Sequence, residues 1–580
     1  MSSNDHKFVQ CNEKDEETLL FFKKGINHSS HGKISTWLTE KYCCAWEGVH
    51  CDNITGRVTE LDLHDQNLTA TQHNITHTSN LFYLDLSYNP YYTSLHMDNL
   101  DWLSPLSSLK YLNLSGIDLH KEINWLHVVA TLPSLLELQL GECNLNNIII
   151  GPSIEYLNLS SLVTLDLSGN NFTSQLPNWF FNLTKDLTYL DLRVNNIHGE
   201  IPPSLQNLQN LRYLDLAYNQ LQGSIPYGIG GLPKLSPNAI EVDLSNNSFS
   251  GSIPHSWKNL KNLQIINLWS NRLSGEGLVH LSDWAQLEIL NFGENEFSGT
   301  IPIKMSQNLA VVILRSNKFE GNIPLSLFNL SYLSQLDLAH NKLSGSIPNC
   351  VYNLTQMITI STNQYKTLAK IELFIKGQEY SVDYFNPNRT IIDLSANNLS
   401  GEVPLELFQL VQLQMLNLSH NNFIGTIPKM IGGMKSMESL DLSNNKFYGE
   451  IPQSLSFLTF LGYLNLSYNN FDGKIPIGPQ LQTFNASSYI GNPKLCGSPL
   501  NNCTTEEDND KSRGHEDGDS IRESLYLGMG VGFATGFWGI CGSMFLIRKW
   551  RHAFYQFVDG VGDKLYVTLM VSMHVQDPEM

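Results

Sequence analysis

A column of acidic and amide side chains is the first pattern in the sequence that could do chemistry. Its members recur at one position of a repeated motif: Asp166, Asp191, Asp215, Asp243, Asn267 and Asn291. Stacked carboxylates can act as acid/base pairs. These lie at a consensus position of solvated strands, so we interpret them as a polar ladder. No HExxH, paired CxxC or GxSxG motif occurs, and no GxGxxG or P-loop opens a helix. We therefore predict no enzyme, catalytic residue, metal or cofactor.

Cysteines form a second pattern, because six of the nine cluster at the two ends of the main body of the chain. These six are Cys11, Cys43, Cys44 and Cys51 before it, and Cys496 and Cys503 after it. Local pairs at both ends indicate an oxidising compartment, with free buried thiols as the alternative. We expect Cys143 and Cys350 to be unpaired.

Apolar residues at outward strand positions form a third pattern. Three successive copies of the motif replace the usual polar residues there, and we take the replacements as ligand-surface candidates: Ile265, Trp269, Ile289, Val311, Ile313 and Arg315. Glu241 and Gln335 flank them. Neighbouring strands lie about 4.8 Å apart, so these side chains should form one exposed patch resembling a binding hot spot. Drift in weakened repeats is the alternative.

The element that positions all of these residues is an LxxLxLxxNxL repeat, mostly 24 residues long, in about sixteen copies. In the stretch from Leu187 to Asn195 the alternation predicts Leu190 and Leu192 facing inward from a short strand. Stacked copies should form a parallel sheet on the concave side of a solenoid, with the Asn bonding backbone groups at each bend. Gly-x-Ile/Val-Pro follows ten copies, and its proline should prevent a long helix on the convex side.

The motif NNxxGxIPxxLxxLxxLxxLdLs resembles the plant class of leucine-rich repeats over residues 56 to 480. The cysteine-containing ends resemble the caps of plant repeat receptors. This resemblance implies that Cys11 pairs with Cys43 and Cys44 with Cys51, while Cys496 and Cys503 form the only local pair at the other end. The implied fold class is an α/β-type leucine-rich-repeat solenoid, capped at both ends, plus one transmembrane helix.

The domain boundaries follow from these patterns. We expect an N-terminal cysteine cap (1–55), leucine-rich repeats (56–356), a non-repeat island (357–389), further repeats (390–480), a C-terminal cap (481–503), an acidic linker (504–524), a transmembrane helix (525–547) and a cytoplasmic tail (548–580). The island is similar in place to that of plant receptor-like proteins, where inserted segments can carry function. Decayed repeats are the alternative.

The apolar run Leu525 to Ile547 has no charge and is long enough to cross a bilayer as a helix. Basic residues follow it, which predicts a single-pass type I protein of the plasma membrane with an extracellular N-terminus. Gly528, Gly532 and Gly536 recur every four residues and could form a helix-pairing face, although glycine is common in such helices.

Seventeen Asn-x-Ser/Thr sequons precede this run and are predicted glycosylation sites. They are Asn27, Asn53, Asn67, Asn74, Asn113, Asn158, Asn171, Asn182, Asn246, Asn329, Asn353, Asn388, Asn398, Asn417, Asn465, Asn485 and Asn502. Residues before Cys11 carry no secretory run, so we expect either a truncated chain or targeting by the membrane helix.

The tail beginning RKWRHAFYQFVDG resembles those of plant receptor-like proteins of the ethylene-inducing xylanase receptor type, which lack a kinase. The resemblance implies recognition of an extracellular protein or peptide elicitor, and defence signalling through partner receptor kinases. A developmental peptide receptor, a polygalacturonase-inhibitor-like wall protein and a truncated decoy are the alternatives. The net charge of −19 excludes nucleic acid as an expected partner.

Overall fold

The computed structural model describes residues 10–24, 26–27, 32–37, 42–66, 68–70, 80–88, 95–146, 159–182, 185–231, 240–359, 371–375, 378–382 and 389–503. The chain divides into two units, Met1–Cys503 and Thr504–Met580, and the description below concerns the first. The predicted linker, the predicted membrane segment with Gly528, Gly532 and Gly536, and the predicted tail lie outside the described residues. In the part that is described, no helix has the length and apolar character needed to span a bilayer.

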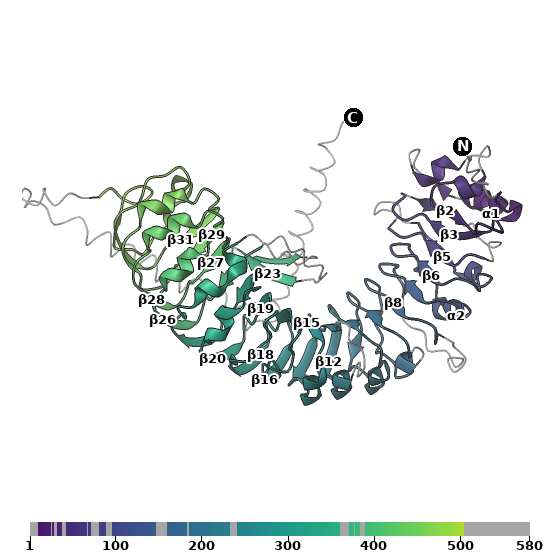
Figure 1. The fold of residues 1–580 in the computed structure, drawn as a ribbon, viewed down its shortest axis with the longest axis horizontal. Coiled ribbons are helices and arrows are strands. Elements are labelled where there is room, and N and C mark those ends of the chain that lie inside the picture. Colours follow the sequence, from purple (N-terminus) through teal and green to yellow (C-terminus); the bar gives the residue numbers. More distant parts are fainter. Residues whose placement is uncertain are drawn as a thin grey trace, which may run out of the picture. The chain divides into compact units, whose positions relative to one another are not determined.

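One long sheet organises the first unit, and its strands follow one another in chain order (Figure 1). It begins with the antiparallel pair β2 and β3. From β3 to β31 each strand pairs in parallel with the next, which makes sixteen stacked strands and matches the predicted number of repeats. The strand pairings run in one open series from β2 to β31, so the sheet is the face of a solenoid rather than a barrel. Its strands are β2 Val49–Cys51, β3 Val58–Asp62, β5 Tyr83–Asp85, β6 Tyr111–Asn113, β7 Glu137–Gln139, β8 Thr164–Asp166, β9 Tyr189–Asp191, β11 Tyr213–Asp215, β13 Ile240–Asp243, β15 Leu263–Asn267, β17 Ile289–Asn291, β19 Val311–Ile313, β21 Gln335–Asp337, β25 Ile391–Asp393, β27 Met415–Asn417, β29 Ser439–Asp441 and β31 Tyr463–Asn465.

A second set of parallel strands runs beside the first, one from each regular repeat. The glycine of the Gly-x-Ile/Val-Pro motif lies in these strands or, at Gly425, directly after one, and at Gly473 the backbone has φ 74°, a conformation that glycine adopts without strain. The nine-stranded sheet consists of β10 His198–Gly199, β12 Gln220–Ser224, β14 Ser248–Gly251, β16 Arg272–Glu276, β18 Glu296–Thr300, β20 Lys318–Asn322, β22 Lys342–Gly345, β26 Asn398–Glu402 and β28 Asn422–Ile424. The strands β30 Tyr448–Glu450, β32 Asn470–Lys474 and β33 Lys494–Cys496 continue the pattern.

Short 3₁₀ helices follow the prolines, which agrees with the prediction that proline prevents a long helix on the convex side. The helix η12 (Leu405–Gln409) begins directly after Pro404, and η14 (Gln453–Phe457) directly after Pro452. Equivalent helices are η6 Pro203–Asn207, η7 Tyr227–Gly231, η8 His255–Asn259, η9 Leu325–Asn329 and η13 Lys429–Gly433. None of these exceeds five residues, because the repeat leaves no room for a longer turn before the next strand.

The core is a continuous stack of leucines between the sheet and the convex helices. Leu190 and Leu192 are fully buried, so the predicted inward positions are confirmed. The asparagine column is structural, also as predicted. Asn445 donates from Nδ2 to the carbonyls of Leu418, Leu442 and Ser443 at 2.9 to 3.2 Å, and its Oδ1 accepts from the Phe423 N–H at 3.0 Å. One side chain thus satisfies backbone groups of two neighbouring repeats.

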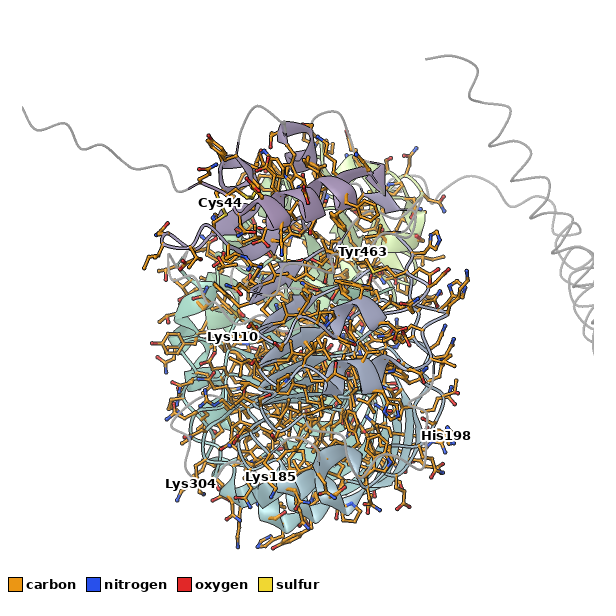
Figure 2. The ribbon with its side chains drawn as sticks, turned by 90° about the vertical axis from the view of Figure 1, so that its right-hand side faces the viewer. Cys44, Lys110, Lys185, His198, Lys304 and Tyr463 are labelled. Atoms are coloured by element: carbon orange, nitrogen blue, oxygen red, sulfur yellow. A yellow bond between two sulfur atoms is a disulfide. The ribbon has the colours of Figure 1, made fainter. Side chains whose placement is uncertain are left out.

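Caps close the two ends of this stack. At the N-terminus, α1 (Glu13–Lys24) places the buried Asp15 against Arg57, whose Nε and Nη2 donate to it at 2.8 and 3.0 Å. Disulfides join Cys11 to Cys43 and Cys44 to Cys51, and Figure 2 locates Cys44 in this cap. At the C-terminus, β33 pairs with β32 and so extends the second set of parallel strands, and Cys496 is bonded to Cys503. Cys143 and Cys350 are free, as predicted.

A separate two-stranded hairpin lies within the predicted island. Its strands, β23 (Ile371–Ile375) and β24 (Gln378–Val382), pair in antiparallel register. The pairing of β21 with β25 joins the repeats on either side, so the long sheet continues without a break across residues 357–389. The island is therefore an insertion into an uninterrupted solenoid. Two further short strands, β1 (Ile26–Asn27) and β4 (Thr69–Ala70), pair near the N-terminal cap.

Candidate functional site on the concave face

The outward positions of the long sheet form columns that run from strand to strand. The parallel register places the first outward residue of each strand beside its equivalent on the next. From β3 to β31 this first column reads Glu60, Tyr83, Tyr111, Glu137, Thr164, Tyr189, Tyr213, Glu241, Ile265, Ile289, Val311, Gln335, Ile391, Met415, Ser439 and Tyr463. The column changes from polar and aromatic to mainly apolar at β15, with Gln335 on β21 as the polar member of this stretch, and back to polar at β29.

Stacked tyrosines mark the first half of the column. The rings of Tyr83 and Tyr111 are 4.2 Å apart and nearly parallel, and those of Tyr189 and Tyr213 repeat the same geometry. The Tyr213 hydroxyl donates to Asp215 Oδ2 at 3.1 Å. Because all four rings are only half-buried, their exposed edges remain available to a bound molecule.

The second column consists of the outward residues two positions further along each strand, among them Asp166, Asp191, Asp215 and Asp243, and Arg193 lies between two of its carboxylates. Its Nε is 3.4 Å from Asp191 Oδ2, and its Nη1 is 3.8 Å from Asp215 Oδ2. Burial raises the pKa of Asp215 to about 7, with Asp243 adding to the shift, and burial together with Asp215 raises the pKa of Asp191. Arg193 opposes both shifts. Without its charge the two neighbouring carboxylates would repel each other at neutral pH.

The carboxylates of this column also stabilise the strand ends. Asp191 Oδ1 accepts from the Arg193 N–H at 3.0 Å, and Asp215 Oδ1 from the Ala217 N–H at 2.9 Å. The same bond recurs at Asp243, Asp337 and Asp441. A contact that recurs in repeat after repeat belongs to the scaffold, so the predicted polar ladder is present. The prediction that its members are solvated is wrong for Asp191, Asp215, Asn267 and Asn291, because these side chains are buried between neighbouring strands.

The predicted ligand-surface residues meet, but solvent does not reach them. Ile265, Trp269, Ile289, Val311 and Ile313 belong to one apolar cluster outside the main core, so the prediction that they form one patch is confirmed. Their exposed fractions are 6% or less, and Arg315 is 3% exposed. The prediction of an exposed binding patch is therefore wrong. Apolar side chains at strand spacing flank one another in the column, which removes their surface from water.

Trp269 and Arg315 show why outward positions became interior ones. The Trp269 indole lies across Gly293 of the next strand, and a methyl group on that glycine would overlap the ring. Arg315 Nη1 is 2.7 Å from Asp337 Oδ2 and 3.9 Å from Asp393 Oδ2. Burial raises the pKa of Asp337 to about 7 against the effect of Arg315. Arg315 thus repeats the role of Arg193 rather than that of a ligand anchor.

Three members of this region were missed or underrated by sequence reasoning. Ile391 and Met415 belong to the apolar cluster, and Gln335 lies between Val311 and Ile391 in the column. The island separates Gln335 from Ile391 in sequence, so their adjacency is visible only if residues 357–389 are removed before the repeats are aligned. The sequence signal that could have found them is their outward position in the strand, which is the same as that of Ile289 and Val311.

The predicted glycosylation sites differ widely in exposure. Those with exposed side chains are Asn53, Asn171, Asn182, Asn329, Asn398, Asn485 and Asn502, and those with half-buried ones are Asn246, Asn353, Asn417 and Asn465. Asn113 is 5% exposed and donates from Nδ2 to Asp85 Oδ2 at 3.3 Å. Its amide is therefore already used by the scaffold. Asn67, Asn74, Asn158, Asn388 and the side chain of Asn27 lie outside the described residues.

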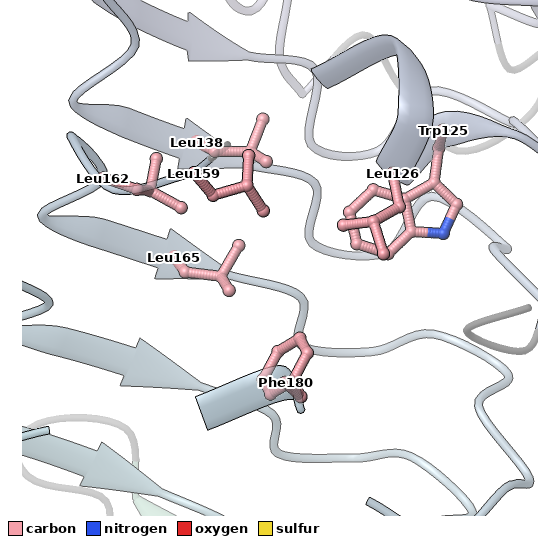
Figure 3. Close-up of a pocket in the computed structure, with 7 residues that line it drawn as sticks. All are labelled: Trp125, Leu126, Leu138, Leu159, Leu162, Leu165 and Phe180. Atoms are coloured by element: carbon pink, nitrogen blue, oxygen red, sulfur yellow. The ribbon is translucent and has the colours of Figure 1, made fainter. Parts of the chain in front are cut away.

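A small void in the core is not a second candidate site. Figure 3 shows its lining, which is apolar apart from one indole nitrogen: Trp125, Leu126, Leu138, Leu159, Leu162, Leu165 and Phe180. It lies between α2 (Trp125–Ala130) and the leucines of neighbouring repeats. Such a space reflects imperfect packing of unequal repeats, because it offers no set of convergent polar groups.

Comparison with known proteins agrees with the repeat architecture. Leucine-rich-repeat profiles match residues 160–221, 186–237, 238–260, 332–354, 412–434 and 436–458, and the profile of the leucine-rich-repeat N-terminal domain matches residues 12–52. A crystal structure of a TDR receptor is 25% identical, with a TM-score of 0.53, and the match covers 69% of this chain and 70% of that one.

Two receptor-like proteins of tomato, Solanum lycopersicum, are similar in sequence. Receptor-like protein EIX2 is 33% identical over 273 residues, which are 36% of this chain and 26% of the relative. Receptor-like protein EIX1 is 32% identical over 267 residues, 35% of this chain and 26% of the relative. The matched region thus spans about a quarter of the length of these relatives. Repeats, cap and relatives together identify a leucine-rich-repeat protein similar to the plant receptor-like proteins of the EIX type.

Proposed function

We propose that this chain is a cell-surface receptor-like protein whose repeats bind an extracellular protein or peptide elicitor, and that it signals in plant defence through partner receptor kinases. The similarity to receptor-like proteins supports the receptor class. The disulfide-closed caps support an oxidising, extracellular location for the repeats.

The observation that carries the proposal is the tyrosine-containing half of the first column. Tyr83, Tyr111, Tyr189 and Tyr213 present ring edges on a rigid sheet, at fixed spacing and beside carboxylates. Tyrosine supplies contact area with little loss of side-chain entropy, and it is enriched where proteins bind one another. Behind Tyr189 and Tyr213 the backbone is held by Asn195 and Asn219, whose Nδ2 groups donate to carbonyls of their own and the preceding repeat, so this part of the surface is preorganised.

This surface replaces the apolar patch as the expected contact region. The apolar cluster is buried and Arg315 is engaged with two aspartates, whereas the tyrosine rings are half-exposed. A polar and aromatic surface of this kind fits a folded protein or an extended peptide. It also leaves the choice between an immune elicitor and a developmental peptide to experiment.

Affinity purification of the tagged full chain from plant membranes tests the proposal. Mass spectrometry of the co-purified proteins should find receptor kinases and an extracellular protein or peptide, both depleted when an unrelated single-pass membrane protein is used as bait. Recovery of the chain from the soluble wall fraction without any kinase would contradict the proposal and favour the wall-protein alternative.

A further inference from the structure

Three glutamates recur in the first column of the concave face, and each of them borders a pair of tyrosines. They belong to the strands β3 to β13, the N-terminal half of the long sheet (Figure 1). In this half the column reads Glu60, Tyr83, Tyr111, Glu137, Thr164, Tyr189, Tyr213 and Glu241. Because neighbouring strands lie about 4.8 Å apart, the position of Glu137 is about 14 Å from that of Glu60 and about 19 Å from that of Glu241.

These glutamates differ from other surface carboxylates because they have no cation to neutralise them. Asp98, Asp283 and Glu296 each form an ion pair with a lysine at 2.8 to 3.1 Å. No lysine, arginine or histidine of the described residues forms such a pair with any of the three glutamates in the column. Arg193 lies on the same face, but Asp191 and Asp215 already share it.

The first half of the concave face is also more acidic than the second half, which has the same number of strands. We compare the first two columns and a third one, which lies two residues beyond the second. From β3 to β13 these columns contain nine carboxylates beside Arg193 and His64: Glu60, Asp62, Asp85, Glu137, Asp166, Asp191, Asp215, Glu241 and Asp243. From β15 to β31 they contain three carboxylates beside Arg315: Asp337, Asp393 and Asp441. Lys110 and Arg212 lie at the edge of the acidic half, one position before the column, and only partly offset its charge.

The end of this surface at β13 contains two groups whose interactions are incomplete. Glu241 is partly buried beside the carboxylate of Glu288, and burial raises its pKa to about 7. A cation beside Glu241 would favour its ionised form and remove the energetic cost of the charge. Ser245 lies at the third outward position of the same strand, is fully buried, and has a hydroxyl group without a hydrogen-bond partner among the described residues. Proteins retain destabilising groups of this kind where function requires them.

We propose that the first half of the concave face binds an extended, basic segment of the extracellular partner, with one lysine or arginine at each of Glu60, Glu137 and Glu241. This inference rests on the proposed function, because it takes the tyrosine column as the ligand surface. The half-buried tyrosine rings supply contact area between the charged positions. Opposite charge on the two partners adds specificity and a faster association rate.

The spacing of the glutamates fits the geometry of an extended chain. Such a chain advances about 3.3 Å per residue, so the two intervals correspond to about four and about six residues. Both numbers are even, and side chains of an extended segment alternate between its two faces. All three basic side chains of the ligand can therefore point toward the sheet at once.

Photo-crosslinking of synthetic peptides to the full chain, purified in detergent, tests this inference. Two eleven-residue probes cover the two directions in which a segment can lie, with lysine at the first, fifth and eleventh positions or at the first, seventh and eleventh. Each probe has a benzophenone side chain midway between its two closer lysines, and serine or glycine elsewhere. Mass spectrometry should find one of these probes attached to residues of β3 to β13. Probes with glutamate in place of each lysine should show at least about fivefold less attachment there.

Two triple variants separate the position of the charge from its total amount. One neutralises the column: Glu60→Gln, Glu137→Gln and Glu241→Gln. The other neutralises exposed glutamates outside the concave face: Glu200→Gln, Glu320→Gln and Glu402→Gln. Both variants lose the same net charge, so a difference between them reports position. We expect at least about fivefold less crosslinking in the column variant, and none of this loss in the control variant. Equal crosslinking of the two triple variants, or equal attachment of the lysine and glutamate probes, would overturn the inference.

A second readout separates this inference from the receptor function on which it rests. The column variant and the control variant are purified from plant membranes, and their co-purified proteins are compared. Loss of a basic extracellular partner from the column variant alone, with receptor kinases still recovered, supports the inference. Recovery of the kinases with an acidic partner that both variants retain would overturn the basic ligand and leave the receptor function standing.

Discussion

Individual side chains on this sheet take their properties from the equivalent residues on the neighbouring strands. The carboxylates of Asp191 and Asp215 would repel each other, and Arg193 between them offsets this repulsion. Arg315 has the same role between Asp337 and Asp393. Repetition brings like charges into register, and an occasional arginine offsets the repulsion. The chemistry of a residue is therefore a property of its column.

The partly buried Glu241 lies near a second carboxylate, that of Glu288, so its charge should limit stability. Burial, with a contribution from Glu288, raises its pKa from 4.5 to about 7. A carboxyl group whose pKa is raised in the folded state contributes stability below pH 4.5, and loses that contribution as the pH rises through about 7. Glu241→Gln should therefore raise the free energy of unfolding at pH 8 by on the order of 1–2 kcal/mol, which raises the unfolding temperature, and should change it little at pH 5. Thermal melts of the two proteins at both pH values measure this. An equal shift at pH 5 and pH 8 would show that the charge is not the cause.

Gly293 should be required by the ring of Trp269. Gly293→Ala introduces a methyl group into the space of the indole, and overpacking of this kind costs about 1–3 kcal/mol. Gly231→Ala is the matched control, because a methyl group there meets no atom of the described residues within 4 Å. Chemical denaturation should show a loss for Gly293→Ala that is smaller when Trp269→Ala is also present. The same loss in the single and the double variant would mean that the ring is not the constraint.

At the scale of elements, sequence periodicity predicted most of the fold. The inward leucines, the asparagine ladder and the short convex helices follow from local spacing, because each repeat contacts only its neighbours. The two N-terminal cysteine pairs came from resemblance and the C-terminal pair from its local spacing, and all three match the bonds found. Burial of the Ile265 to Ile313 patch could not be predicted. The alternation along a strand shows which face of the sheet a side chain points from. It does not show how closely equivalent side chains on neighbouring strands pack, or that Ile391 and Met415 belong to the same cluster.

The N-terminal cap should depend on its second disulfide. Cys44→Ser removes the bond to Cys51 at the end of β2, the strand that covers the edge of the first repeat. A native disulfide of this kind contributes about 2–5 kcal/mol, so we expect lower yield and earlier protease cleavage near the N-terminus. Limited proteolysis followed by mass spectrometry measures this effect. Cys143→Ser, which removes a free buried thiol, serves as the comparison. Cleavage of Cys44→Ser at the same rate as the unaltered chain would contradict a stabilising role for the bond.

At the scale of the whole molecule, the solenoid separates three tasks. The leucine stack and asparagine ladder hold the shape, the caps protect its ends, and the outward columns are free to vary. The first half of the column has varied toward tyrosine and acid, and the middle toward apolar packing. We expect recognition in the first half, because its rings remain accessible.

Retention of the extracellular binding partner by tyrosine variants tests this central claim most directly. The tagged full chain is compared with the double variant Tyr189→Ala and Tyr213→Ala, and with Tyr227→Ala, which removes a tyrosine that is 71% exposed on the convex side. Each is purified from plant membranes, and the co-purified partner is quantified by mass spectrometry at equal recovery of the chain. The account predicts at least about a fivefold loss in the double variant, corresponding to roughly 1 kcal/mol, and none in Tyr227→Ala. Full retention by the double variant would contradict it.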